Sequence, residues 1–425
     1  MVSELPPVTR EMFDDLRAAV ASVAEPLHAA GHRVYLVGGL VRDRLLAADR
    51  TLDHDLTTDA PPERIRDLVA GVADAVWFQG ERFGTVGLRV GDVTMEITTH
   101  RAEAYVSDSR KPVVRFSTEL AEDLARRDFT VNAMAVDVAD GTLHDPFGGR
   151  ADLEARILRT PLDPVESFSD DPLRMLRAAR FLARYELTSA EGLVEAARSL
   201  VGRMEIVSAE RIRDELFRLL EVDDPTAGFD LLDEMGLLET VLPEVAAFEA
   251  PNRAVLERRV AEAPVDAVLR LCVLAHAVGG EEILGRWVST LRLPGRDAGR
   301  AQTLLDGAAM IADQRAEPSD EDVRRLAVRV GDGLDDVVVF AGLVGAGSAV
   351  GALADSVVRL RAVGEFDDLG PGLDGVTVMR LLDLESGPEV GEVMAWLGEL
   401  RLVEGRLPDE EIRGRLIEWW GTTRD

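Results

Sequence analysis

The sequence predicts an α+β fold in which a mixed-sheet domain comes first and only helices follow. Between residues 33 and 150, short strand-like apolar runs are interspersed with runs of helical character. From about residue 249 onward the periodic segments have helical spacing. A chain of 425 residues can form two to four domains with ample core. We expect a mixed-sheet head over 1–150, a helical neck over 151–248, a helical body over 249–365 and a helical tail over 366–425.

The composition is that of an acidic globular protein. The formal net charge is −30, and acidic residues outnumber basic ones in the first 150 residues, in the next hundred and in the remainder. Nucleic-acid-binding domains usually carry a basic surface, so such a partner would require arginines gathered on one local surface. The single cysteine excludes a disulfide framework and suits a reducing compartment. The polar N-terminus does not resemble a signal peptide, and we expect a cytoplasmic protein.

One segment requires a membrane check. Residues 337–354 carry no charge over eighteen positions, which is near the lower limit for a membrane span. Four glycines lie within this segment, and aspartates flank it. Small residues allow close packing between helices, so we predict a buried helix and no membrane partner.

The periodicity of the sequence places the remaining elements. A stripe of apolar residues at helical spacing predicts an amphipathic helix over 9–30 that packs on the following domain. A second helix is expected over 61–72, with Pro62 in its first turn. Strands are expected at 35–37, at 52–56, from 83 onward and at 93–98.

The first chemical motif follows the first expected strand. Gly38 and Gly39 end that strand, and glycines let backbone N–H groups approach a phosphate closely. Arg42 can add a charge-assisted hydrogen bond. Asp53 and Asp55 alternate along the next strand, so their carboxylates lie on one face. Carboxylate oxygens suit Mg²⁺, and the combination indicates metal-assisted phosphoryl transfer.

Two further features lie between this motif and residue 120. Glu96 alternates with apolar neighbours on a strand, so it could join the aspartates as a third metal-facing carboxylate; the alternative is a solvent-exposed glutamate on an edge strand. The polar segment 103–116 is expected to form a mobile loop.

The second motif combines arginine and aspartate side chains. Arg126 and Arg127 precede Asp128, and Asn132 follows one helical turn later. Such a set offers a phosphate contact and an acceptor for a ribose hydroxyl. Alone, two arginines beside an aspartate more often form a surface charge cluster.

The third motif opens the helical part. Asp171 precedes a proline, as is usual at a helix start. Arg174, Arg177 and Arg180 then recur at a spacing of three along one flank of the expected helix. An aspartate acceptor and an arginine donor one turn apart can meet the Watson–Crick edge of a base.

Together the three motifs resemble those of class II tRNA nucleotidyltransferases, the CCA-adding enzymes, and of their bacterial poly(A) polymerase relatives. The resemblance is specific over about residues 33–245. It implies a polymerase-β-like head and the addition of CCA to the tRNA 3′ end from CTP and ATP. It also implies two Mg²⁺ ions held by Asp53 and Asp55, with Glu96 as the third catalytic carboxylate. In that family a flexible loop in the region of 103–116 helps the switch from C to A addition.

The same resemblance assigns the nucleotide-binding residues. Arg127 would contact the incoming nucleotide, and Asp128 and Asn132 would shape its sugar site. Asp171 and Arg174 would select the base. Two further sets complete the prediction: Gly38, Gly39 and Arg42 would hold phosphates with Arg127, and Arg177 and Arg180 would neutralise triphosphate or tRNA phosphate.

Three alternatives remain at this stage. The chain could be a poly(A) polymerase or an enzyme that adds only CC or only A. It could be a non-catalytic RNA-binding protein, although the carboxylates and arginines are intact. It could be a metal phosphohydrolase acting through its C-terminal half, but His276 there is followed by alanine and is expected in the core. A monomer and a homodimer fit equally well.

Overall fold

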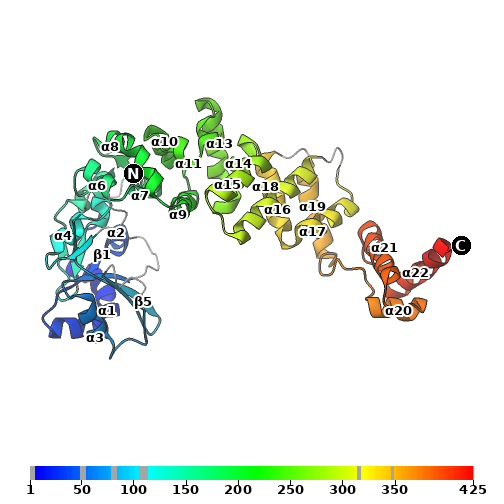
Figure 1. Ribbon diagram of the computed structural model, residues 1–425, viewed down its shortest axis with the longest axis horizontal. Coiled ribbons are helices and arrows are strands. Elements are labelled where there is room, and N and C mark those ends of the chain that lie inside the picture. Colours follow the sequence, from blue (N-terminus) through cyan, green and yellow to red (C-terminus); the bar gives the residue numbers. More distant parts are fainter. Residues whose placement is uncertain are drawn as a thin grey trace. The chain divides into compact units, whose positions relative to one another are not determined.

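A computed structural model describes residues 5–47, 54–77, 84–104, 113–313, 317–345 and 349–424. The chain divides into two compact units, Met1–Ala247 and Phe248–Asp425 (Figure 1). All strands of the described residues lie in the first unit, and helices make up the second. The predicted α+β class is therefore confirmed, whereas the division into head, neck, body and tail stays a prediction.

The first unit is built on a mixed seven-stranded sheet with the order β3-β4-β5-β2-β1-β8-β9. Strands β2 and β5 pair in parallel, and the other neighbours pair antiparallel. The strands are β1 (Val34–Val37), β2 (His54–Thr58), β3 (Ala75–Trp77), β4 (Thr85–Val90), β5 (Val93–Thr99), β8 (Ala135–Asp137) and β9 (Leu143–His144).

Two predicted strands differ from those observed. The strand expected at 52–56 extends instead to Thr58, because its threonines continue the pairing with β1 and β5. The strand expected from Phe83 is β4, which begins at Thr85, and Phe83 lies outside the described residues.

Helices cover one face of the sheet. The helix predicted over 9–30 is a short 3₁₀ turn η1 (Arg10–Phe13) followed by α1 (Asp14–Ala29), and the next predicted helix is α3 (Pro62–Val69). Both α1 and α3 contact the sheet and each other. Side chains at alternate positions of the strands are fully buried beneath them, among them Leu36, Leu56, Val86, Leu88 and Ile97. The opposite face carries polar side chains over β2, β4 and β5 and is open there, whereas over β1 and β8 its Tyr35, Val37 and Ala135 are buried in an apolar cluster with Leu124.

The segment expected to be a mobile loop is paired at both ends. Strands β6 (Arg101–Ala104) and β7 (Val113–Phe116) form an antiparallel hairpin, so the loop prediction is wrong for these residues. The backbone N–H of Arg101 also donates to the buried carboxylate of Asp123 at 3.2 Å, which fixes the start of β6. The rest of the predicted loop, residues 105–112, lies outside the described residues.

The remainder of the first unit is mainly helical. Helix α7 (Leu173–Tyr185) contacts both α9 (Ala209–Leu220) and α10 (Thr226–Glu234). The other elements are α2 (Gly39–Leu45), α4 (Leu120–Ala125), η3 (Thr130–Asn132), α5 (Gly149–Ala155), β10 (Ile157–Leu158), α6 (Pro164–Asp170), β11 (Thr188–Ser189), α8 (Leu193–Leu200), η4 (Val201–Ile206), α11 (Leu238–Val241) and α12 (Pro243–Ala246).

The second unit consists of helices in its described residues. These are α13 (Ala250–Glu262), α14 (Ala267–Val278), α15 (Glu281–Thr290), α16 (Gly295–Ala312), α17 (Asp320–Val330), η5 (Gly331–Gly333), α18 (Leu334–Val344), α19 (Val350–Ala362), α20 (Gly375–Leu382), α21 (Pro388–Glu404) and α22 (Asp409–Arg424).

Two predictions for this unit are wrong. The uncharged segment 337–354 is not one helix, because Gly345 adopts a φ of +70° and ends α18 before α19 begins. No helix among the described residues is long and apolar enough to cross a membrane. His276 is exposed instead of in the core, since it follows the buried part of α14, and its ring lies edge-on to Phe340 at 6.1 Å.

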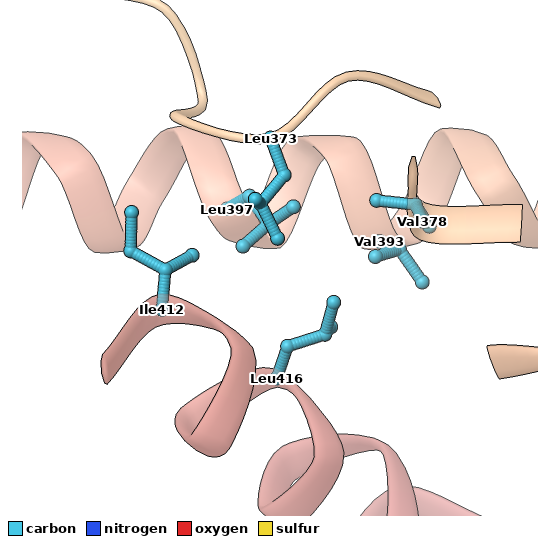
Figure 2. Close-up of a cluster of buried hydrophobic side chains, with 6 residues drawn as sticks. All are labelled: Leu373, Val378, Val393, Leu397, Ile412 and Leu416. Carbon is cyan, nitrogen blue, oxygen red and sulfur yellow. The ribbon is translucent and has the colours of Figure 1, made fainter. Parts of the chain in front are cut away.

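The last three helices pack around their own apolar cluster (Figure 2). The cluster consists of Leu373, Val378, Val393, Leu397, Ile412 and Leu416. The buried side chain of Arg401 on α21 binds the segment that precedes the cluster. It donates to the Glu365 carboxylate at 2.5 Å and to the Asp368 carbonyl oxygen at 3.0 Å. The cluster and this arginine hold residues 364–375, which contain no helix before Gly375.

Replacing Leu397 by alanine should open α21 more easily. Leu397 is 1% exposed, and a buried Leu→Ala change typically costs about 2–5 kcal/mol. Amide hydrogen exchange of α21 should report this loss as a lower local opening free energy. The matched control is Val403→Ala on the same helix, which is 47% exposed and should change the opening free energy by less than about 1 kcal/mol. Equal effects of the two variants would contradict the assigned core.

Candidate active site

Two carboxylates lie side by side on the open face of the sheet. Asp55 on β2 is directly opposite Glu96 on β5 in the parallel register, and both residues are exposed. Residues that face each other across paired strands point to the same side, and neighbouring strands lie about 4.8 Å apart. The sequence prediction that Glu96 joins the carboxylate face thus has geometric support. Asp53, the other predicted metal ligand, lies outside the described residues.

The double glycine brings the carboxylate face next to an arginine. Gly38 follows β1 with a φ of +74°, a conformation that side chains disfavour. A Cβ atom on Gly38 would lie 3.0 Å from Nη1 of Arg127 and 4.0 Å from Oδ2 of Asp55. Residues from three distant parts of the sequence therefore meet at this turn. The Gly38 N–H itself donates to the Met134 carbonyl oxygen at 3.4 Å.

Arg127 is positioned by a buried carboxylate. Its Nη2 donates to Oδ2 of Asp123 at 3.3 Å, and Asp123 is only 1% exposed. The hydroxyl of Thr57 on β2 also lies 3.5 Å from this oxygen. Among the described residues, Nε of Arg127 has no hydrogen-bond partner. Asp123 thus links the arginine to the strand that carries Asp55.

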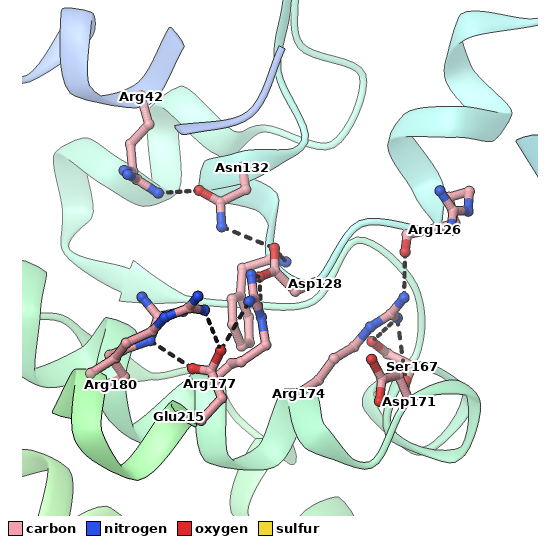
Figure 3. A network of polar contacts seen from close by, with 12 residues as sticks. Arg42, Arg126, Asp128, Asn132, Ser167, Asp171, Arg174, Arg177, Arg180 and Glu215 are labelled. Atoms are coloured by element: carbon pink, nitrogen blue, oxygen red, sulfur yellow. Dashed lines mark hydrogen bonds and ion pairs between the residues drawn. The ribbon is translucent and has the colours of Figure 1, made fainter. Parts of the chain in front are cut away.

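Asp128, Asn132 and Arg42 form a buried chain of polar contacts (Figure 3). The side-chain amide of Asn132 donates to Oδ1 of Asp128 at 2.9 Å, and its carbonyl oxygen accepts a hydrogen bond from Arg42. Arg42 also donates to Asp43 at 2.7 Å, and its guanidinium lies 4.2 Å from the ring centroid of Tyr185. Helix α2, which carries Arg42, is thereby attached to the end of α7.

The arginines of α7 balance buried carboxylates. Arg177 donates two hydrogen bonds to Oδ2 of Asp128, at 3.0 and 2.5 Å, and a third to Glu215 at 3.3 Å. Arg180 donates to the other oxygen of Glu215 at 2.7 Å. Both carboxylates are at most 9% exposed. The two arginines predicted to neutralise phosphate are therefore already paired within the protein.

Burial and pairing oppose each other in setting the pKa values of this network. Burial raises the pKa of Asp128. The charge of Arg177 and the hydrogen bonds from Asn132 and Arg177 lower this pKa by more than burial raises it, so the pKa lies below the ordinary value of 3.8. Burial likewise lowers the pKa of Arg177, while Asp128 and Glu215 raise it above its ordinary value. Asp128 and Arg177 consequently form a stable ion pair.

The proposed base-reading residues lie at the start of α7. One oxygen of Asp171 accepts the Leu173 backbone N–H at 3.2 Å, and the other accepts from Arg211 at 2.9 Å. Arg174 is 8% exposed and donates to the Ser167 hydroxyl at 2.8 Å. Its Nη2 also donates to the backbone carbonyl oxygen of Arg126 at 2.5 Å. Arg174 thus connects α7 to the segment that carries Arg127.

Sequence reasoning missed three residues that position the site. Asp123 stands one helical turn before Arg127, a spacing that permits an ion pair. Glu215 lies beside the apolar stripe of α9, which could have indicated a buried and therefore paired carboxylate. Tyr185 carries no such signal, because its contact with Arg42 depends on how α7 packs.

The sequence of this chain is similar to known proteins over about half of its length. Residues 34–159 match the model of the poly A polymerase head domain, and residues 188–249 match the probable RNA and SrmB-binding site of polymerase A. The CCA-adding enzyme of Lactobacillus helveticus is 41% identical over 49% of this chain and 51% of its own length. That of Bacillus subtilis is 40% identical over 45% and 47%. The matched segments span about half the length of these relatives.

Solved structures extend the similarity of fold to the whole chain. The Bacillus stearothermophilus CCA-adding enzyme in complex with CTP has a TM-score of 0.76 and is 25% identical, with 97% of this chain and 98% of that chain covered. The Thermotoga maritima CCA-adding enzyme complexed with tRNA has a TM-score of 0.64 at 20% identity, over 97% and 96% of the two chains. The latter likeness concerns the fold alone.

Replacing Asp128 by asparagine should destabilise the protein in a pH-dependent way. Removal of one partner from a buried ion pair costs about 3–5 kcal/mol, so the free energy of unfolding should fall by this amount near neutral pH. Because the folded pKa of Asp128 is lowered from 3.8, its stabilising contribution is present above that pH and is lost as the pH falls. The difference between wild type and variant should shrink by up to about 1.4 kcal/mol per pH unit below about pH 4.

Urea unfolding at a series of pH values measures this difference. Asp230→Asn in the same unit is the matched control, since Asp230 is exposed and its replacement should change stability by no more than about 0.5 kcal/mol. A difference for Asp128→Asn that stays constant down to about pH 3 would refute the assigned ion pair.

Proposed function

We propose that this chain, which belongs to the family of class II tRNA nucleotidyltransferases and bacterial poly(A) polymerases, adds CCA to the tRNA 3′ end from CTP and ATP and releases pyrophosphate. The meeting of Asp55, Gly38 and Arg127 at one turn carries the proposal. It joins a carboxylate face to a phosphate-binding arginine, as phosphoryl transfer requires. The family models and the names of the relatives support the same conclusion.

The carboxylates fit the divalent metal ions on which such a reaction depends. Asp55 and Glu96 are exposed, adjacent and rich in the hard oxygen ligands that Mg²⁺ prefers. Their strand spacing of about 4.8 Å matches side chains that share two ions. We assign Asp53 to the same set from the alternation of the sequence. Bound there, Mg²⁺ would make the primer 3′-hydroxyl more acidic and offset the charge that develops on the leaving pyrophosphate.

The chain's own residues orient the nucleotide. Arg127 would contact the triphosphate beside Gly38, where a side chain would block the approach of a phosphate. Gly39 would contribute backbone at the same turn. Asp128 and Asn132 would form the wall of the sugar site, held in place by Arg177 and Arg42.

Base selection is assigned to Asp171 and Arg174. A carboxylate and a guanidinium can accept from and donate to the Watson–Crick edge of cytosine or adenine. Hydrogen bonds to Ser167 and to the Arg126 carbonyl hold Arg174 in place before a base binds. We infer that the protein itself selects the base and that no nucleic-acid template is needed.

A poly(A) polymerase is the second candidate, because both matching family models are named for polymerase A. Either activity would act in the cytoplasm on an RNA 3′ end, and a monomer and a homodimer both fit. Incubation with Mg²⁺, CTP, ATP and tRNAs lacking A, CA or CCA, followed by 3′-end sequencing, separates the two. Growth of long A tracts in place of CCA would refute the primary proposal.

Replacing Asp55 by asparagine should abolish nucleotide addition while leaving tRNA binding intact. The variant loses a metal-binding charge, and we expect turnover to fall by a factor on the order of 10²–10³ or more. Single-turnover incorporation of labelled CTP measures the loss, and filter binding measures the affinity for tRNA. The control is Asp92→Asn at the exposed turn between β4 and β5, which should remain active. Normal turnover of the Asp55 variant would refute the metal assignment, whereas a wild-type chain that binds tRNA but adds no nucleotide would favour a non-catalytic RNA-binding role.

Replacing Arg174 by lysine or alanine should reduce base selection more than triphosphate binding. One bidentate contact provides about 1–3 kcal/mol of discrimination, so misincorporation of UTP or GTP should rise by about 5- to 150-fold. Lysine keeps the charge but lacks the planar fork of donors. Arg184→Ala on the exposed side of the same helix is the matched control. Intact selectivity with a reduced rate would show that Arg174 has no part in base selection.

A further inference from the structure

A tryptophan lies in the same row of the sheet as the carboxylates. Trp77 on β3 pairs with Gly87 on β4, Gly87 pairs with Glu96 on β5, and Glu96 pairs with Asp55 on β2. Directly paired residues point to the same face of a sheet. The indole and the two carboxylates therefore share the open face, although Trp77 is more than twenty residues from Asp55 in the sequence.

Gly87 leaves room for this indole. A Cβ atom on Gly87 would lie 1.9 Å from Nε1 of Trp77 and 2.2 Å from its Cε2, so any side chain there would displace the ring. Gly87 is buried beneath the indole, whereas Trp77 itself is partly exposed. The ring consequently occupies the place of the missing side chain, about one strand spacing or 5 Å from the row position of Glu96.

The geometry of phosphoryl transfer indicates which reactant would lie beside Trp77. In an in-line displacement the attacking and leaving oxygens lie on opposite sides of the phosphorus. Gly38 and Arg127, which we assign to the triphosphate, lie on the β1 side of Asp55. The attacking 3′-hydroxyl must then approach from the other side, where Glu96 and Trp77 lie.

The charge on this part of the sheet suits an RNA end. Arg89 lies two residues after Gly87 on β4 and so points to the same face, and its side chain is exposed. Proteins bind single-stranded RNA with aromatic side chains that stack on the bases and with cations that contact the phosphates. A partly exposed indole and an exposed arginine form such a pair next to the carboxylates.

We propose that Trp77 is the stacking platform for the terminal base of the RNA primer and that Arg89 contacts a phosphate of the same end. This inference rests on the proposed function. The stack would place the 3′-hydroxyl of the terminal nucleotide over Glu96 and Asp55. Since the ring of Trp77 carries no base-specific donors or acceptors toward its face, it would accept a primer that ends in either of the bases being added.

The test compares Trp77→Leu with Trp77→Phe in steady-state assays. Loss of one base stack should raise the KM for a tRNA ending in CC by about 5- to 150-fold, while the KM for ATP stays unchanged. Phenylalanine keeps an aromatic face and should restore most of the affinity for the primer. An unchanged KM for tRNA in Trp77→Leu, or an equal rise in both KM values, would refute the platform.

Two more variants keep the test decisive if Trp77→Leu does not fold. Gly87→Ala should displace the indole and raise the KM for tRNA in the same way, and a normal KM would overturn the proposal. Arg89→Gln should reduce the salt dependence of tRNA binding by about one phosphate contact, and an unchanged slope would refute its assigned contact. A wild-type chain that extends no RNA refutes the proposed function itself, whereas an active wild type with unaffected variants refutes only this inference.

Discussion

The ion pair between Asp128 and Arg177 is the contact on which the candidate site depends. Both groups are largely removed from water, so each would be costly to bury without the other. Asp128 follows the two arginines of the sheet domain, while Arg177 lies in the middle of α7. The pair therefore holds the helix against the segment that carries Arg127. Through Asn132 the same carboxylate also reaches Arg42 and the glycine turn.

This arrangement explains how a chain of net charge −30 can contain an arginine-rich centre. Three of the central arginines are each matched by a buried carboxylate: Arg127 by Asp123, Arg177 by Asp128 and Arg180 by Glu215. Their positive charge is used first to order the site, and total charge says little about the local field near a ligand. Composition alone was therefore a poor guide to the local charge at the site.

The sequence was sufficient for features that arise from local patterns. Alternation identified the strand of Glu96, and helical spacing identified the amphipathic helix α1. The mixed-sheet class followed from the order of such segments. The sequence was insufficient where pairing between distant segments determines which residues lie next to each other. The opposition of Asp55 to Glu96, and the position of Trp77 over Gly87, depend on strand register. The hairpin at the ends of the expected loop was missed for the same reason, because neither strand is recognisable in the sequence without its partner beside it.

The contact of Arg174 with the Arg126 carbonyl joins the arginine proposed to select the base to the segment proposed to bind phosphate. Arg126 immediately precedes Arg127, so the carbonyl that accepts from Arg174 and the backbone N–H of Arg127 belong to the same peptide unit. Peptide units are planar and stiff. A rotation of the Arg174 guanidinium toward a base would therefore either break its hydrogen bond to the Arg126 carbonyl or turn the whole peptide unit. If the bound base does not provide replacement contacts, Arg174 loses hydrogen bonds at a buried site, which is costly. Under the proposed assignments, the connection would give a physical route by which the identity of the base influences the position of the triphosphate.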